Sequence, residues 1–185
     1  MTEVKFLTKA ELEAGLPAIR QSPKDDGELK LIVRRPKVNG RDVVTEASLD
    51  PVEGLVGDNW RYRRSSRTAD GAPHPDMQLN IINTRLMALI APDASRWALA
   101  GDQLFLDLDL SQENLPAGTR LALGAAVIEV TAEPHTGCKK FVARFGVEAM
   151  KFVNSPVGRE LCLRGINAKV VQSGVIRVGD RAKKL

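Results

Sequence analysis

One cysteine in a short loop, Cys138, carries the most distinctive chemistry in this sequence of 185 residues. It lies in TAEPHTGCKKFVARFG, where an expected strand leads into a tight loop and an expected helix begins at or just after the cysteine. Unpaired amide groups and the helix dipole stabilise a thiolate in a first helical turn, and Lys139 and Lys140 add to this effect. Such a thiolate can carry sulfur or bind a soft metal. His135 could hydrogen-bond or position a ligand beside it.

Each of these residues also has a structural interpretation. A lone cysteine such as Cys138 more commonly packs as a small hydrophobe beneath a turn, and a loop histidine such as His135 often caps backbone carbonyls. Cys162, in ELCLRG, is expected in the interior of a strand with a structural role, and His74, in PHPD, is expected to be exposed. Two cysteines and two histidines exclude a zinc ribbon, an iron–sulfur cluster and a disulfide scaffold.

Basic side chains gather in the later part of the chain. Residues 1–59 hold 9 Lys/Arg and 11 Asp/Glu, whereas residues 60–185 hold 18 and 12, so the second part can attract an anion. The segments WRYRRSSR and GCKKFVAR contain most of the clustered charge. A solvated surface loop is the structural alternative for the first of them. An aromatic content of 4% argues against a nucleic-acid binder that works by base stacking.

The hydrophobic pattern predicts a mainly β, α+β fold with a β-barrel-like core and two or three helical insertions. In residues 102–111, Leu104, Leu106 and Leu108 alternate with polar side chains, as in a half-buried strand. Thr8 and Glu11 form a capping-box pattern at the start of one short helix, which Gly15 and Pro17 are expected to end. Strands are expected at 29–35, 42–50, 77–82, 102–111, 119–124, 126–133, 166–171 and 175–178, the last two as a hairpin, and helices at 8–14, 83–91 and 139–155.

Several separated stretches, taken in order, resemble the MOSC domain, the module named after the C-terminal part of molybdenum cofactor sulfurases. They are GLVGD at 54–58, QLNIIN at 78–83, ENL at 113–115, the cysteine loop at 127–141 and the expected closing hairpin at 165–180. The cysteine loop is the specific part of the resemblance. On this basis residues 1–29 are expected to form an N-terminal extension with a short helix, and residues 30–185 the MOSC domain.

The resemblance implies a β-barrel with a basic pocket for the phosphate of the molybdenum cofactor, molybdopterin. Cys138 would be the catalytic cysteine that ligates molybdenum or carries sulfur, and Asn114 and His135 would lie near the cofactor. Two residues, Asn59 and Trp60, depart from the family, because many members have a histidine shortly after the Gly-Asp turn. The candidates for binding the phosphate, chosen by charge and neighbourhood, are Arg61, Arg63, Arg64, Lys139, Lys140 and Arg144.

Three functions follow as hypotheses. The first is a molybdenum-dependent oxidoreductase that reduces small N-hydroxylated compounds with electrons from a reductase partner. The second is a persulfide sulfur carrier for metal–sulfur cluster or cofactor maturation; a separate cysteine desulfurase would load it, because a pyridoxal-phosphate domain is not expected within this length. The third is a non-catalytic module whose arginine loop binds an acidic partner. Without a recognisable targeting segment or a membrane-spanning stretch, we expect a cytoplasmic protein.

Overall fold

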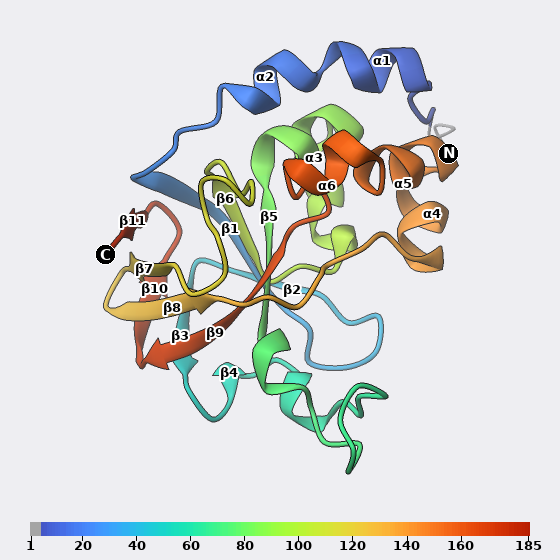
Figure 1. Ribbon diagram of the computed structural model, residues 1–185. Helices are drawn as coiled ribbons and strands as arrows, with labels where there is room; N and C mark the ends of the chain where they lie inside the picture. The colour runs from blue at the N-terminus through green and yellow to red at the C-terminus, as the bar shows by residue number, and fades with distance from the viewer. Residues whose placement is uncertain (1–4) are drawn as a thin grey trace.

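Seven strands close into a β-barrel in the computed structural model, which describes residues 5–185 (Figure 1). Strand β11 pairs with β1 and thereby closes the ring. Neighbouring strands are antiparallel except β5 and β6, which run parallel. The predicted mainly β fold with a barrel-like core is confirmed. In order around the barrel the strands are β1 (Gly27–Arg34), β6 (Leu104–Asp107), β5 (Leu79–Asn83), β9 (Ile166–Gln172), β8 (Ala126–Val130), β7 (Arg120–Leu123) and β11 (Arg181–Lys184).

The remaining strands lie beside the barrel. Strand β2 (Asp42–Val44) extends the sheet from β1, while β3 (Glu46–Asp50), β4 (Gly54–Leu55) and β10 (Gly174–Arg177) form a separate three-stranded sheet. The predicted closing hairpin is wrong, because β9 pairs with β5 and β8 whereas β10 pairs with β3. The chain changes sheets at Gly174, which lies directly against the backbone of Ala125, where a Cβ atom would overlap. The predicted strand 42–50 is likewise divided at Thr45.

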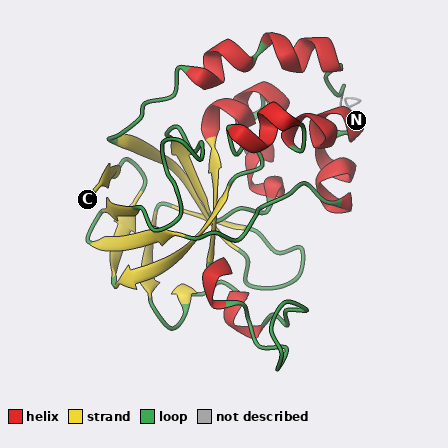
Figure 2. Ribbon diagram, in the orientation of Figure 1, coloured by secondary structure: helices red, strands yellow, loops and turns green. Residues whose placement is uncertain are grey.

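Six short α-helices, more than the two or three expected, and three 3-10 helices complete the described chain. The α-helices gather on one side of the barrel, and the ends of β4 and β5 carry the short helices η1 and η2 on another (Figure 2). None of the helices in residues 5–185 has the length and apolar character needed to cross a bilayer. The helices are α1 (Lys9–Ala14), α2 (Leu16–Arg20), η1 (Trp60–Tyr62), η2 (Pro75–Met77), α3 (Thr84–Ile90), η3 (Ala94–Ala100), α4 (Lys139–Phe145), α5 (Val147–Val153) and α6 (Pro156–Glu160).

Helix starts follow the local sequence closely. The predicted capping box is present in α1, with the amide of Thr8 donating to Glu11 at 2.7 Å and the amide of Glu11 donating to the Thr8 hydroxyl at 3.3 Å. Asn83 caps α3 and accepts two amide hydrogen bonds of 2.7 and 3.2 Å. Pro17 does not end the helical region, because it lies in the first turn of α2, where a missing N–H costs nothing.

The predicted single helix 139–155 is two helices separated at Gly146. This glycine has φ 91°, a conformation that ends α4 and that a residue with a side chain adopts at a cost. Phe6 packs directly against the glycine, so a Cβ atom there would also collide with the phenyl ring. Both helices bury large apolar side chains, Phe141 and Phe145 on α4 and Phe152 on α5.

Two hydrophobic cores hold the elements together. One fills the barrel, and the other lies between the barrel and the helices. Leu104, Leu106, Leu108 and Leu110 all contribute to the barrel core, as the alternation predicted, although β6 ends at residue 107. Cys162 does not lie inside a strand: it occupies the turn between α6 and β9 with φ 48° and packs partly against the barrel core. Its structural role stands, but its predicted position is wrong.

Candidate functional site

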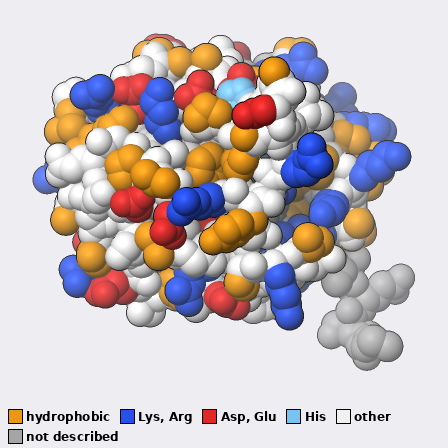
Figure 3. Space-filling view, turned by 90° about the horizontal axis from the view of Figure 1, so that it is seen from below, with side chains coloured by type: hydrophobic (Ala, Val, Ile, Leu, Met, Phe, Trp, Pro, Cys, Tyr) orange, Lys and Arg blue, Asp and Glu red, His pale blue; other side chains and the backbone are white. Residues whose placement is uncertain are grey.

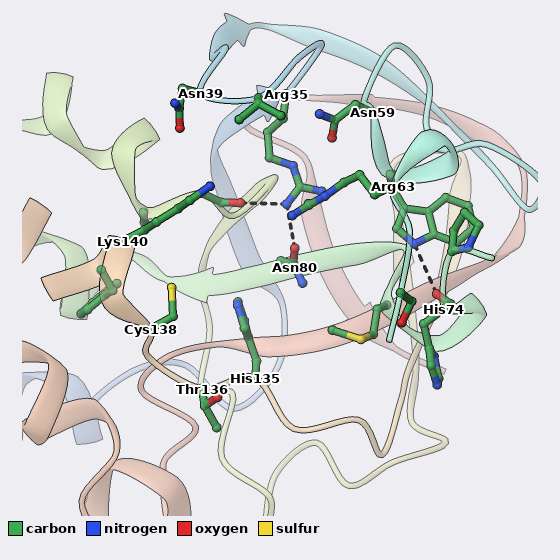
Figure 4. Close-up of a pocket in the computed structure, with 18 of the residues that line it drawn as sticks. Arg35, Asn39, Asn59, Arg63, His74, Asn80, His135, Thr136, Cys138 and Lys140 are labelled. Carbon is green, nitrogen blue, oxygen red and sulfur yellow. Dashed lines mark hydrogen bonds between the residues drawn. The ribbon is translucent and has the colours of Figure 1, made fainter. Parts of the chain in front are cut away.

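A pocket of about 410 Å³ opens where several loops around the barrel converge. Its size falls within the range of sites for small molecules and cofactors. Seen from below, the surface carries Lys and Arg side chains and no visible Asp or Glu toward the right-hand edge of Figure 3. The walls come from the end of β1 and the loop that follows it, the segment 59–67, the start of β5, residues 100–101, the loop 135–138 and α4 (Figure 4).

Cys138 lies at the mouth of this pocket with an exposed side chain. It is the N-cap of α4, so the helix begins just after the cysteine as expected, and its side chain makes no capping hydrogen bond. The loop before it is fixed to α5, because the amide of Gly137 donates to the Asn154 side chain at 2.9 Å. Gly137 also lies so close to Met150 and Asn154 that a side chain there would crowd them. The thiol is therefore presented by an anchored loop and is free to react.

A buried ion pair forms the back wall. The carboxylate of Asp58 accepts hydrogen bonds from Arg35 Nε and Nη2 at 2.8 and 2.9 Å. Arg35 Nη1 donates to the Asn80 side chain at 2.8 Å and to the carbonyl of Gly101 at 2.9 Å (Figure 4). The GLVGD segment makes this possible, because its expected tight turn exists, with Gly57 at φ 84°, and directs Asp58 behind Arg35.

A second buried group underlies the cysteine loop. Arg164 Nη1 donates to both carboxylate oxygens of Asp102 at 2.8 and 3.0 Å. His135 Nδ1 lies 3.5 Å from an Asp102 oxygen, which is too far for a hydrogen bond. This nitrogen has no hydrogen-bond partner among the described residues, so it does not cap a backbone carbonyl. Burial lowers the pKa of His135 well below its usual value, and Arg164 and Arg35 lower it further. Burial raises the pKa of Asp102, whereas Arg164 opposes this change.

The structure brings most, but not all, of the predicted site residues together. Arg63, Arg64, His135, Cys138, Lys140 and Arg144 line the pocket. Arg61 and Lys139 do not line the pocket, and Arg61 Nη1 lies 3.7 Å from a carboxylate oxygen of Glu53. Asn114 is also outside it: its amide donates to the carbonyls of residues 24 and 109, and its oxygen accepts from Lys184. Asn114 was expected beside a cofactor, but it lies outside the pocket and ties its loop to β11.

His74 differs from its expectation. It was expected to be exposed, but only 16% of its side chain is accessible. Its Nδ1 accepts a hydrogen bond from the amide of Asp76 at the start of η2, and its Nε2 lies 3.7 Å from Glu133. The proline on each side orders this segment, and His74 contributes to the pocket lining.

Four residues in or behind the pocket wall escaped the sequence reasoning: Arg35, Arg41, Asp102 and Arg164. Arg35 stands at the end of a strand segment and carries no motif of its own, and its partner is 23 residues away. Asp102 and Arg164 are separated by 62 residues and become partners only when β6 and β9 take their places in the barrel. For Arg41, the only signal in the sequence was its charge.

Comparisons with known proteins agree with this architecture. A family model, the MOSC domain, matches residues 76–183, which is more than half of the chain. The chain belongs to the MOSC domain family, which is associated with binding of the molybdenum cofactor. No curated protein matches the chain. The matched segment includes Cys138, whereas Arg35 and Arg63 lie before it.

Solved structures share the fold at low sequence identity. YiiM from Escherichia coli is 20% identical, with 85% of this chain and 69% of that chain covered and a TM-score of 0.54. YuaD from Bacillus subtilis is 16% identical, with 85% and 94% covered and a TM-score of 0.59. YiiM from Geobacillus stearothermophilus is 14% identical, with 86% and 75% covered and a TM-score of 0.57. These likenesses establish the fold and carry no information about the reaction.

Proposed function

We propose that this protein binds a molybdenum cofactor in the pocket and reduces small N-hydroxylated compounds, with Cys138 as the protein ligand of the metal. The observation that carries the proposal is the exposed Cys138 thiol at the mouth of a pocket whose charged lining is entirely basic among residues 5–185. A thiolate is a suitable donor for a soft, sulfur-coordinated metal, and arginine forks bind phosphate oxygens in pairs. Membership of the MOSC family supports the same cofactor.

The buried polar atoms of the pocket fit an organic cofactor. Asn59 Oδ1, His135 Nδ1 and Arg164 Nε are buried and have no hydrogen-bond partner within the described chain. All three belong to residues that line the pocket. Buried polar atoms without partners are costly, so a ligand that supplies donors and acceptors stabilises such a site. The edge of a pterin ring offers both kinds of group.

The reaction divides between the cofactor and the chain. When bound, the cofactor supplies a molybdenum centre that exchanges two electrons with the substrate. Reduction of an N–OH group to N–H consumes two electrons and two protons and releases one water molecule. Cys138 ties the cofactor to α4, and the basic side chains hold its phosphate. His135 is neutral at pH 7, so it contributes hydrogen bonds and no further positive charge. We infer that the electrons come from a reductase partner.

Metal and pterin analysis tests the proposal directly. Protein purified from a host with intact cofactor synthesis and added molybdate is expected to contain about one molybdenum and one pterin per chain. Cys138→Ser is expected to lose the metal, whereas the matched Cys162→Ser, outside the pocket, keeps it. Wild-type protein without molybdenum and pterin, from a host that loads a known molybdoenzyme, contradicts the proposal.

The exposure of Cys138 also favours a second candidate function, persulfide transfer. In this reaction the Cys138 thiolate attacks the outer sulfur of a desulfurase persulfide, a new S–S bond forms on Cys138, and the desulfurase cysteine leaves as a thiolate. Incubation with a cysteine desulfurase and cysteine is then expected to add about 32 Da, one sulfur atom, at Cys138. The same mass gain in Cys138→Ser, or no gain in the wild type, rules this candidate out.

A further inference from the structure

The charge of the pocket is larger than one cofactor phosphate needs. Nine basic side chains line it, and no Asp or Glu in the described residues does so. A phosphate monoester carries a charge of about −1.5 to −2 at pH 7. The positive charge left over for other ligands therefore depends on how many of the nine side chains already form ion pairs within the protein. The basic residues are Arg35, Lys37, Arg41, Arg63, Arg64, Arg67, Lys140, Arg144 and Arg164.

Three of the nine are neutralised by carboxylates behind the pocket wall. Arg35 pairs with Asp58 at 2.8 Å, and Arg164 pairs with Asp102 at 2.8 Å. Arg67 pairs with Glu133 at 2.6 Å. The other six have no carboxylate within 4 Å in residues 5–185. These six unpaired cations exceed the charge of a single phosphate by about four.

Arg41 and Arg144 form a fixed pair within this surplus. Arg41 Nε donates to the carbonyl of Ala98 at 3.0 Å, and Arg144 Nη1 donates to the carbonyl of Leu99 at 2.6 Å. Both guanidinium groups approach Gly101, where a Cβ atom would lie 3.4 Å from Arg41 Nη2 and 3.8 Å from Arg144 Nη1. Neighbouring backbone carbonyls thus hold the two cations beside the same glycine. A pair of like charges held in this way is stabilised by an anion that binds between or beside them.

Two further cations without a carboxylate partner, Arg63 and Lys140, also line the pocket. Arg63 extends from the loop after η1 and lies over Arg35, while Lys140 reaches into the pocket from α4 (Figure 4). Burial lowers the pKa of Arg63, and the charge of Arg35 lowers it further. Burial likewise lowers the pKa of Arg41, followed by the charges of Arg144 and Arg35. The charge of Arg63 also lowers the pKa of Arg41, so these cations repel one another across the pocket. They differ in position, because Arg41 and Arg144 approach Gly101 whereas Arg63 lies over Arg35 (Figure 4).

We propose that the pocket binds two anionic groups at once, the cofactor phosphate near Arg63 and a carboxylate, phosphate or sulfate of the substrate at Arg41 and Arg144. This inference rests on the proposed function and narrows its substrate to anionic N-hydroxylated compounds. Arg144 follows Cys138 by six residues, so the helix places it about 9 Å along α4 from the metal ligand. The anion site and the metal ligand therefore lie on the same wall of the pocket, where one small molecule can contact both.

Melting of the metal-free protein tests the Arg41–Arg144 site without any catalysis. The melting temperatures of the wild type and of the double variant Arg41→Gln/Arg144→Gln are first measured in chloride. Replacing chloride by inorganic phosphate at equal ionic strength is expected to raise the melting temperature of the wild type more than that of the double variant. The control Lys24→Gln/Arg159→Gln removes two exposed charges outside the pocket and should respond to phosphate as the wild type does. Equal phosphate responses in all three proteins overturn the site.

Paired substrates test what the site recognises. With cofactor-loaded protein we compare the neutral N-hydroxybenzamidine and its 4-carboxylate. The carboxylate is expected to have at least a tenfold higher kcat/KM, and Arg41→Gln/Arg144→Gln is expected to reduce that ratio at least tenfold. A ratio of one or below in the wild type overturns the proposal. So does a ratio that the double variant leaves unchanged.

The second anion has one other possible source, a nucleotide extension of the cofactor with its additional phosphate. Mass spectrometry of the released cofactor distinguishes the two. A monophosphate pterin together with preference for the carboxylate supports the substrate site, whereas a dinucleotide with no such preference overturns it. Failure of the proposed function looks different, because protein without molybdenum or pterin can still show the phosphate response at Arg41 and Arg144.

Discussion

Arg35 and Asp58 form a two-point ion pair in which Nε and Nη2 of the guanidinium donate to the two carboxylate oxygens at 2.8 and 2.9 Å. Their side chains are only 6% and 0% exposed. The same carboxylate accepts from the amides of Arg35 and Trp60, so it joins the end of β1 to the start of η1. The pair therefore fixes two walls of the pocket relative to each other.

Removing the carboxylate leaves a buried cation without its partner. We expect Asp58→Ala to lower the free energy of unfolding by about 3–5 kcal/mol. Urea denaturation followed by circular dichroism measures the change. The matched control is Glu53→Ala, which removes the exposed partner of Arg61 and should cost less than about 1 kcal/mol. Similar losses for the two variants would show that Asp58 does not hold the pocket walls.

Gly165 is a second structural determinant of the pocket. It has φ 108°, and a Cβ atom there would overlap the carbonyl oxygen of Ile81 and lie 3.2 Å from His135 Nδ1. We expect Gly165→Ala to cost both the strain of a positive φ and a backbone collision, about 3 kcal/mol or more in total. Thermal or urea denaturation measures this loss.

Gly118 provides the matched control for Gly165, because it has φ 91° with nothing within 4 Å of the position of a Cβ atom. Gly118→Ala should show the conformational strain alone, about 1–2 kcal/mol. The difference between the two variants isolates the collision with Ile81. If Gly118→Ala costs as much as Gly165→Ala, close packing at Gly165 is not the cause.

The two cysteines are expected to differ strongly in reactivity. Cys138 is exposed, whereas burial, together with the charge of Asp109, raises the pKa of Cys162 to about 11. At pH 7 only about one Cys162 in ten thousand is then a thiolate, which is the reactive form. Titration of the folded metal-free protein with a disulfide reagent should show one rapid thiol, and Cys138→Ser should abolish it. A rapid thiol that persists in Cys138→Ser but disappears in Cys162→Ser contradicts this assignment.

Local patterns in the sequence predicted the features that depend on neighbouring residues. The capping box at Thr8, the alternation in 104–110 and the loop that presents Cys138 all follow from short-range geometry and burial. The closing hairpin was predicted on the same basis and is wrong. The reason is that β5 and β8 occupy both edges of β9 within the barrel, so no edge of β9 is free for β10, which pairs with β3.

The polar framework of the pocket was beyond prediction for a physical reason. The Arg35–Asp58 and Asp102–Arg164 pairs join residues far apart in the chain, and a single buried charged residue has no periodicity that distinguishes it from a surface residue. Asn114 belongs to a motif that predicted a position beside the cofactor, but it lies outside the pocket. Its side-chain amide instead donates hydrogen bonds to two backbone carbonyls. The clusters of basic residues and the cysteine motif indicated the region of the pocket. Which of its basic side chains have no carboxylate partner is determined by the three-dimensional fold.

His135 predicts a specific dependence of stability on pH. The groups that face it are Asp102, Arg164 and Arg35, and burial among them lowers its pKa below the value of about 6.5 of an unfolded chain. Below pH 6.5 the unfolded protein therefore binds a proton that the folded protein does not. The contribution of His135 to stability is fully present above pH 6.5 and is lost as the pH falls toward its lower folded pKa.

His135→Gln isolates this contribution, because all other titrating groups, His74 included, remain in both proteins. We expect the difference in unfolding free energy between wild type and variant to be constant above about pH 7. Below pH 6.5 it should fall by up to about 1.4 kcal/mol per pH unit, the limit for one proton. Urea denaturation at intervals from pH 5 to 8 measures the difference. A difference that is flat over this range, or that grows as the pH falls, would mean that Asp102 accommodates a charged His135 in the folded pocket.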